Sequence, residues 1–133
     1  MKMLVFLTSV LLSATSFSDN HSTENQYLGF YYFSAPDADA VVAAMDKFYA
    51  SDCGKRYPAN VALAEQVFNG GYESTHFFLN NYANAKAQQE AAEIFRSCPA
   101  ALEFLSALES AGVRSTMEHL SFPLITEGDS SRD

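Results

Sequence analysis

The sequence of 133 residues has no tryptophan, only two cysteines and four prolines, and only eight Lys and Arg against sixteen Asp and Glu. Because 48% of the residues are hydrophobic, the composition excludes collagen-like and largely disordered chains. The formal net charge of −8 makes nucleic acid and anionic membrane surfaces unfavourable partners. A chain of this length suits one ordinary domain with a single hydrophobic core.

Several motifs that carry chemistry are also missing. The sequence contains no His-x-His, no His-Glu-x-x-His, no Cys-x-x-Cys, no phosphate-cradling glycine loop and no dinucleotide fingerprint. Glu118 and His119 are adjacent, so on a strand they would point to opposite faces. The run Asn69-Gly70-Gly71-Tyr72 is typical of a hairpin turn. We therefore predict no metal site and no cofactor.

A long hydrophobic run is lacking everywhere except at the N-terminus. There, Lys2 is followed by an apolar run over residues 3–12 and then by small residues, which predicts a secretory signal peptide over residues 1–18. A membrane anchor is the alternative, but a span needs ~20 apolar residues and this run is about half as long. We expect cleavage after Ser18, or else after Ser16, and a secreted or periplasmic protein without membrane attachment.

The segments flanking the expected domain are polar. Residues 19–26 predict a flexible N-terminal segment, residues 27–125 the folded domain, and residues 126–133 a disordered tail. Asn20-His21-Ser22 is an N-glycosylation sequon, which has meaning only in a eukaryotic secretory pathway.

Hydrophobic periodicity predicts the elements of the domain. Residues 27–33 are apolar or aromatic at both alternating positions, as in a central strand covered on both faces. Pro99 interrupts a long helical pattern, and Gly112 ends it with a left-handed cap. Pro123 indicates an edge strand or a bulge. The other expected elements are a helix over 36–50, strands over 61–68 and 75–79, helices over 85–97 and 99–111, and a strand over 114–125.

This order of elements predicts an α+β, ferredoxin-like β-α-β-β-α-β fold. Its four-stranded antiparallel sheet has the order 4-1-3-2, with the helices on one face. The other face has no cover within the chain, so we expect a homodimer that pairs through it. On the first strand we expect Tyr27, Gly29, Tyr31 and Phe33 to face the partner. The alternate set then packs under helical residues, namely Val41, Met45, Phe95 and Leu102.

The arrangement resembles the dimeric α/β-barrel superfamily, which includes small antibiotic-biosynthesis-type monooxygenases, YciI-like proteins and stress-responsive barrel proteins. The resemblance covers about residues 27–125. It is carried by Ser74-Thr75-His76-Phe77-Phe78-Leu79, followed by a helix interrupted at Ser97-Cys98-Pro99. It implies the barrel dimer. Haem-degrading members use a tryptophan that this chain lacks, and YciI-like members use a His–Asp pair that the predicted strands do not supply.

Cys53 and Cys98 are the only cysteines, and an even number in an exported chain predicts a disulfide. Both follow helices that should run in the same direction on one sheet face, and they should reach similar heights. On the chain-entropy model, closing a loop of this length stabilises the fold by ~4 kcal/mol. The alternative is two reduced thiols, with Cys98 packed in the core.

His76 and His119 fall on the third and fourth predicted strands, on either side of the first strand. At ordinary strand spacing their backbones would be ~10 Å apart. We expect both to face one space together with Tyr31, Asn80 and Glu65. Such a set could bind the polar end of a ligand or perform acid–base chemistry. Alternatively, each histidine is a hydrogen-bonded residue at the dimer seam.

Three functions remain open on this evidence. The first is an exported homodimer that binds a small, mainly apolar ligand, with the aromatic first strand as one wall. The second is a cofactor-independent monooxygenase-type enzyme with His76 as acid–base and Tyr31 or Asn80 orienting the substrate. The third is a purely structural interaction module whose interior is filled with side chains. A pocket reached by His76 would favour the first two.

Overall fold

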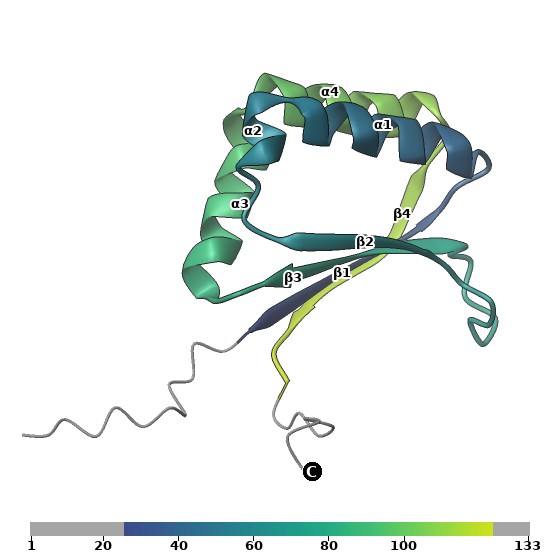
Figure 1. The fold of residues 1–133 in the computed structure, drawn as a ribbon. Coiled ribbons are helices and arrows are strands. Elements are labelled where there is room, and N and C mark those ends of the chain that lie inside the picture. The colour runs from purple at the N-terminus through teal and green to yellow at the C-terminus, as the bar shows by residue number, and fades with distance from the viewer. Residues whose placement is uncertain (1–25, 124–133) are drawn as a thin grey trace, which may run out of the picture.

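A computed structural model describes residues 26–123, in which four strands form one antiparallel sheet with helices on one side (Figure 1). The strand order β2-β3-β1-β4 is the predicted order read from the other edge. The expected signal peptide, the segment 19–25 and the tail 126–133 lie outside the described residues. The strands are β1 (Tyr27–Ser34), β2 (Asn60–Glu65), β3 (His76–Tyr82) and β4 (Arg114–Ser121).

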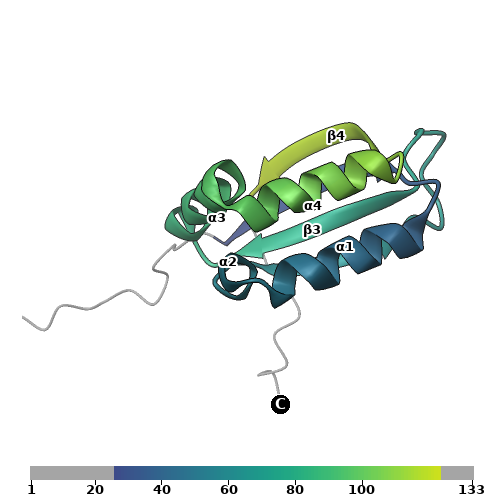
Figure 2. The same ribbon diagram turned by 90° about the horizontal axis from the view of Figure 1, so that it is seen from above.

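The helical layer contains four helices, α1 (Ala38–Ala50), α2 (Asp52–Lys55), α3 (Ala85–Ser97) and α4 (Pro99–Ser110). From above, α1 and α4 lie side by side over the sheet, while β4 runs beyond α4 (Figure 2). One edge of the sheet is therefore left without a helix over it. Within residues 26–123, no helix combines the length and apolarity needed to cross a membrane.

Local chemistry sets the helix boundaries. Asp37 and Asn84 cap α1 and α3, and each side chain accepts a hydrogen bond from a backbone N–H three residues on. Pro99 occupies the first turn of α4, where its missing N–H costs no helical bond. Gly112 follows α4 with φ of 77°. The division of the late helical region at Pro99 and the cap at Gly112 are thus confirmed.

The strands differ from prediction at their ends. β2 stops at Glu65, and the chain leaves the sheet in a loop in which Val67 and Phe68 are 101% and 87% exposed. The predicted end at residue 68 is therefore wrong: Val67 continues the alternation of Val61 and Leu63, but it lies with Phe68 in an exposed loop. β3 continues to Tyr82, beyond its predicted end. β4 is an edge strand as expected, but it ends at Ser121, so Pro123 lies outside it.

The predicted disulfide is present and links Cys53 to Cys98, with the two Cα atoms 6.6 Å apart. It joins α2 to the junction of α3 and α4, and Cys53 belongs to the core formed by Phe48, Phe104 and their neighbours. Gly54 makes this packing possible, because a Cβ at that position would collide with the backbone carbonyl of Phe48. Cys53 and Gly54 therefore lie in a short helix against α1, an element that the periodicity does not predict.

In the structure, the two sets of alternating residues on β1 lie on the faces opposite to those predicted from the sequence. Tyr31 and Phe33 face the helices, because both line the space beneath the helical layer, as do the partners of Tyr31 on β3 and β4, Phe78 and Glu118. Leu28, Phe30 and Tyr32 lie on the bare face. Alternation determines which residues share a face, but both sets are apolar, so it could not determine which set the helices cover.

One predicted covering residue is also misplaced. Val41 is buried and Met45 and Phe95 are half-buried, as expected, whereas Leu102 on α4 is 50% exposed. The adjacent Ala101 is completely buried, so the inward face of α4 is rotated by one residue from the prediction.

The bare face carries a continuous aromatic cluster that spans three strands. Phe30 on β1 stacks on His119 of β4 at 4.7 Å between ring centroids. Tyr32 contacts Phe77 of β3 at 5.3 Å and His119 at 5.8 Å. We call these four residues the bare-face cluster. It lies opposite the helices and has no cover among the described residues.

Candidate functional site

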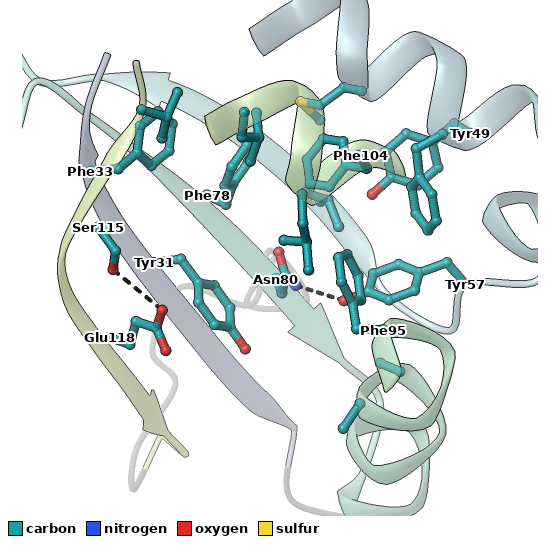
Figure 3. Close-up of a pocket in the computed structure, with 18 of the residues that line it drawn as sticks. Tyr31, Phe33, Tyr49, Tyr57, Phe78, Asn80, Phe95, Phe104, Ser115 and Glu118 are labelled. Atoms are coloured by element: carbon teal, nitrogen blue, oxygen red, sulfur yellow. Dashed lines mark hydrogen bonds between the residues drawn. The ribbon is translucent and has the colours of Figure 1, made fainter. Parts of the chain in front are cut away.

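A cavity of about 360 Å³ lies between the sheet and the helices (Figure 3). Its walls are mainly aromatic and aliphatic, and its few polar groups come from the sheet, α3 and the segment before β2. That combination is typical of small-molecule sites. The lining residues are Tyr31, Tyr32, Phe33, Met45, Phe48, Tyr49, Tyr57, Val61, Phe78, Asn80, Tyr82, Gln88, Ala91, Ala92, Phe95, Phe104, Leu105, Leu108, Val113, Ser115 and Glu118.

Three phenols and one amide form a polar cluster at one end of this cavity. Asn80 Nδ2 donates to the hydroxyls of Tyr57 and Tyr82, at 2.9 Å in each case. The hydroxyls of Tyr31 and Tyr82 share a hydrogen bond of 3.3 Å. β1 and β3 bring Tyr31, Asn80 and Tyr82 together, while Tyr57 reaches the cluster from the segment between α2 and β2. We call these four residues the phenol–amide cluster.

Gly29 allows the cluster to form on the floor of the cavity. A Cβ at that position would lie 3.0 Å from a ring carbon of Tyr31 and 3.2 Å from one of Tyr82. The missing side chain therefore leaves room in which these two rings lie against β1. The sequence predicts that Gly29 faces the partner, but the chain's own tyrosines fill the room beside it.

Burial holds the tyrosines in their neutral form. Desolvation raises the pKa of Tyr31 far above its usual value, and the hydrogen bond and charge of Tyr82 and the nearby carboxylate of Glu118 raise it further. Desolvation also raises the pKa of Tyr57, with Tyr82 as the next cause. Burial raises the pKa of Tyr49 to about 12. The raised pKa values of Tyr31, Tyr49 and Tyr57 therefore favour phenol hydroxyls over phenolates at these three positions.

Among the described residues that line the cavity, only Glu118 is charged. It lies on β4 opposite Tyr31, is exposed, and accepts a hydrogen bond of 3.3 Å from the Ser115 hydroxyl. Because no helix covers β4, Glu118 and Ser115 lie at the solvent side of the cavity (Figures 2 and 3). Within residues 26–123, the lining contains no Lys, Arg or His that could balance the charge of a bound anion.

The structure brings together only some of the residues predicted to form a site. Tyr31 and Asn80 line the cavity. His76 and Glu65 are register partners on the same face, but neither lines the cavity. His76 instead stacks on Phe33 at 5.9 Å, and its Nδ1 is 2.7 Å from the Thr75 hydroxyl oxygen.

The prediction that His119 shares a space with His76 is wrong. His119 belongs to the bare-face cluster, on the other side of the sheet. A bulge between Tyr32 and Phe33 shifts the pairing of β1 with β4, and His119 pairs with Phe30, which faces away from the helices. Alternation alone could not fix this register, because the bulge inserts one extra residue on β4.

Two members of the phenol–amide cluster are not predicted from the sequence. Tyr57 follows the short helix α2 and looks like a loop residue, and Tyr82 falls beyond the predicted end of its strand. A weak signal exists for Tyr82, since it continues the alternation of His76, Phe78 and Asn80 on β3. No comparable local signal marks Tyr57. Among residues 26–123, no three His, Cys, Asp or Glu side chains form a group able to hold a metal ion.

No protein-family model and no curated protein matches the sequence. Solved structures are nevertheless similar to it in fold. A mutant of SnoaB, a cofactor-independent oxygenase from Streptomyces nogalater, has a TM-score of 0.53 and 15% identity, over 79% of this chain and 99% of that one. A dimeric ferredoxin-like protein from an uncultured marine organism has a TM-score of 0.53 and 12% identity, over 77% and 99% of the two chains.

An antibiotic biosynthesis monooxygenase-type protein from Chloroflexus aurantiacus gives a TM-score of 0.47 at 10% identity, over 77% of this chain and 95% of that chain. At such low identities the likeness shows the fold alone. The chain has a ferredoxin-like fold, as the element order predicts.

Proposed function

We propose that the protein is an exported, homodimeric binding protein whose cavity holds a small, mainly apolar molecule. The observation that carries this proposal is the cavity of about 360 Å³ with apolar walls and one polar cluster. Natural ligand sites have this size and this distribution of polar groups. A structural module with a filled interior would have no such cavity, so the third of the functions left open by the sequence is disfavoured.

A neutral fluorescent dye tests the proposal. N-phenyl-1-naphthylamine is apolar, and its fluorescence rises when it leaves water. We expect saturable binding of one dye per protomer. Ala92→Phe, which places a ring in the cavity from α3, should weaken dye binding at least about tenfold, since the ring occupies the ligand's volume.

Ala85→Phe is the matched control, because Ala85 is exposed on the same helix and does not line the cavity. It should bind the dye as the unmodified protein does. Equal binding by both variants would place the dye elsewhere and would overturn the proposal that the cavity is the site.

A cofactor-independent oxygenase is the second candidate, favoured by the likeness of fold to SnoaB. Tyr31 and Asn80 line the cavity and could orient a substrate there, as the sequence suggested. The acid–base role suggested for His76 finds no support, because His76 does not line the cavity. The two candidates differ in a direct measurement. An oxygenase would consume dioxygen when a bound compound turns over, whereas a binding protein would not.

The homodimer is proposed to form through the bare face of the sheet. Phe30, Tyr32 and Phe77 are only half-buried in one chain, and a second sheet would remove them from water. Burial of a large apolar side chain contributes about 1.5–3 kcal/mol, so several such side chains can outweigh the cost of association. The similar protein from an uncultured marine organism is itself described as dimeric.

Export follows from the N-terminal sequence and agrees with the disulfide, since disulfides persist in oxidising compartments. We predict that the exported protein begins near Asp19. Intact-mass measurement of protein recovered from the medium or periplasm checks this. Retention of residues 1–18 in that fraction would overturn the prediction, and cleavage after Ser16 would correct only its position.

A further inference from the structure

The polar end of the cavity contains an acceptor without a partner. Asn80 is 7% exposed, and its Oδ1 is shielded from water and makes no hydrogen bond. Asn80 is part of the cavity lining, and in Figure 3 its oxygen points away from the strand toward the helical layer. A buried acceptor left unpaired destabilises a protein unless something else satisfies it. Such an atom in a ligand-sized cavity indicates a missing donor.

The same cluster also contains at least one phenolic proton that is not donated within the cluster. Both amide protons of Asn80 go to phenols, one to Tyr57 and one to Tyr82. Even if Tyr82 is bonded to both of the other phenols, only two of the three phenolic protons are used. At least one hydroxyl of Tyr31, Tyr57 or Tyr82 can therefore donate to a ligand.

A single functional group satisfies both requirements. A hydroxyl accepts one hydrogen bond and donates another, whereas a carbonyl or an ether only accepts. We infer that the cavity recognises the hydroxyl of an uncharged, otherwise apolar alcohol or phenol, which donates to Asn80 Oδ1 and accepts from a phenol of the cluster. The inference rests on the proposed binding function and specifies its ligand.

Charged ligands fit the site less well. An anion would find no basic residue in the lining, and Asn80 Oδ1 and Glu118 would both repel it. A cation could approach Glu118, but that carboxylate is exposed, and the phenol–amide cluster offers a cation no carboxylate. Burial of either charge there would cost more than burial of a hydroxyl.

Three naphthalene compounds test the inference in the unmodified protein. 2-Naphthol donates and accepts, 2-methoxynaphthalene has the same ring system but only accepts, and naphthalene-2-carboxylate is anionic at pH 7. By calorimetry we expect 2-naphthol to bind at least about tenfold more tightly than the ether, because a site built around a hydroxyl discriminates against analogues that lack the proton. The carboxylate should bind more weakly than 2-naphthol.

Asn80→Leu removes the acceptor and keeps the approximate size of the side chain. Its preference for 2-naphthol over the ether should fall to less than about threefold. Asn81→Leu is the matched control, since Asn81 is the next residue of β3 and bonds Gln26 rather than the cluster. It should keep the full preference. The comparison in the unmodified protein decides the question even if Asn80→Leu does not fold.

The outcomes separate this inference from the proposal it rests on. If N-phenyl-1-naphthylamine binds in the cavity but 2-naphthol has no advantage over the ether, hydroxyl recognition is wrong and the binding function stands. Tighter binding of 1-naphthylmethylammonium than of 2-naphthol would also overturn hydroxyl recognition, in favour of a cationic ligand. If neither the dye nor any naphthalene compound binds, the binding function fails and the inference fails with it.

Discussion

Phe77→Asp is expected to convert the protein from a dimer into monomers at tens of micromolar. Phe77 lies on β3, one of the two central strands of the sheet, and its ring contacts Phe30 and Tyr32 within the bare-face cluster. In the proposed dimer, an aspartate there would be buried against apolar side chains without a cationic partner. The dissociation constant should rise at least about a hundredfold, which light scattering over a concentration series can measure.

Leu102→Asp is the control for this substitution. Leu102 is also a large exposed hydrophobic residue, but it lies on α4, on the side of the sheet opposite the bare face. The variant should remain dimeric. A monomeric unmodified protein at tens of micromolar would contradict the dimer itself. A dimeric Phe77→Asp variant would instead show that the chains pair through another surface.

Because the two faces of β1 are reversed relative to the prediction, the dimer interface must be tested at a different residue. From the sequence, Tyr31→Asp would place the charge at the seam, because Tyr31 was assigned to the partner-facing set. Tyr31 instead belongs to the phenol–amide cluster on the helix-covered face. A charge at Tyr31 should therefore impair the cavity, and a charge at Phe77 the dimer. The cavity and the proposed dimer interface lie on opposite faces of the sheet, so substitutions at Tyr31 and Phe77 can test them separately.

The fold could be predicted because most of its signals are local. A proline inside a helical pattern interrupts the helix, so Pro99 predicts the division between α3 and α4. Gly112 supplies the left-handed conformation that ends α4. The first strand is apolar at both alternating positions, which placed it correctly in the middle of the sheet. The order of these elements was then enough to give the topology.

The site could be predicted only in part, because long-range register decides it. Tyr31 and Asn80 share a face through the pairing of β1 with β3, which alternation anticipates. His119 was misplaced because a bulge on β4 changes the parity of its pairing. Tyr57 joins the cluster only because α2 and the segment after it fold back over β3. No pattern near Tyr57 in the sequence encodes that approach.

Removal of the disulfide is expected to cause a large loss of stability. In Cys53→Ala/Cys98→Ala, the loop closed between residues separated by 45 positions becomes unconstrained in the unfolded chain. On the chain-entropy model this lowers the free energy of unfolding by about 4 kcal/mol. Typical domains have only about 5–15 kcal/mol in total, so the variant would have little stability left.

Urea unfolding measures this loss, with both proteins at one concentration because dissociation of a dimer contributes to unfolding. Dithiothreitol supplies the matched control, since it should lower the midpoint of the unmodified protein toward that of the double variant and leave the variant unchanged. A loss below about 1 kcal/mol would contradict a structural role for the bond.

Removal of the disulfide should also weaken binding in the cavity, because the bond links two parts of the cavity wall. Cys53 lies four residues before Tyr57, and Cys98 lies three residues after Phe95; both aromatic residues line the cavity and their rings are in contact at 5.5 Å. Without the bond, α2 and the end of α3 are held together only by packing. Dye affinity should therefore fall in the double variant even where it remains folded, and unchanged affinity would show that packing alone positions Tyr57.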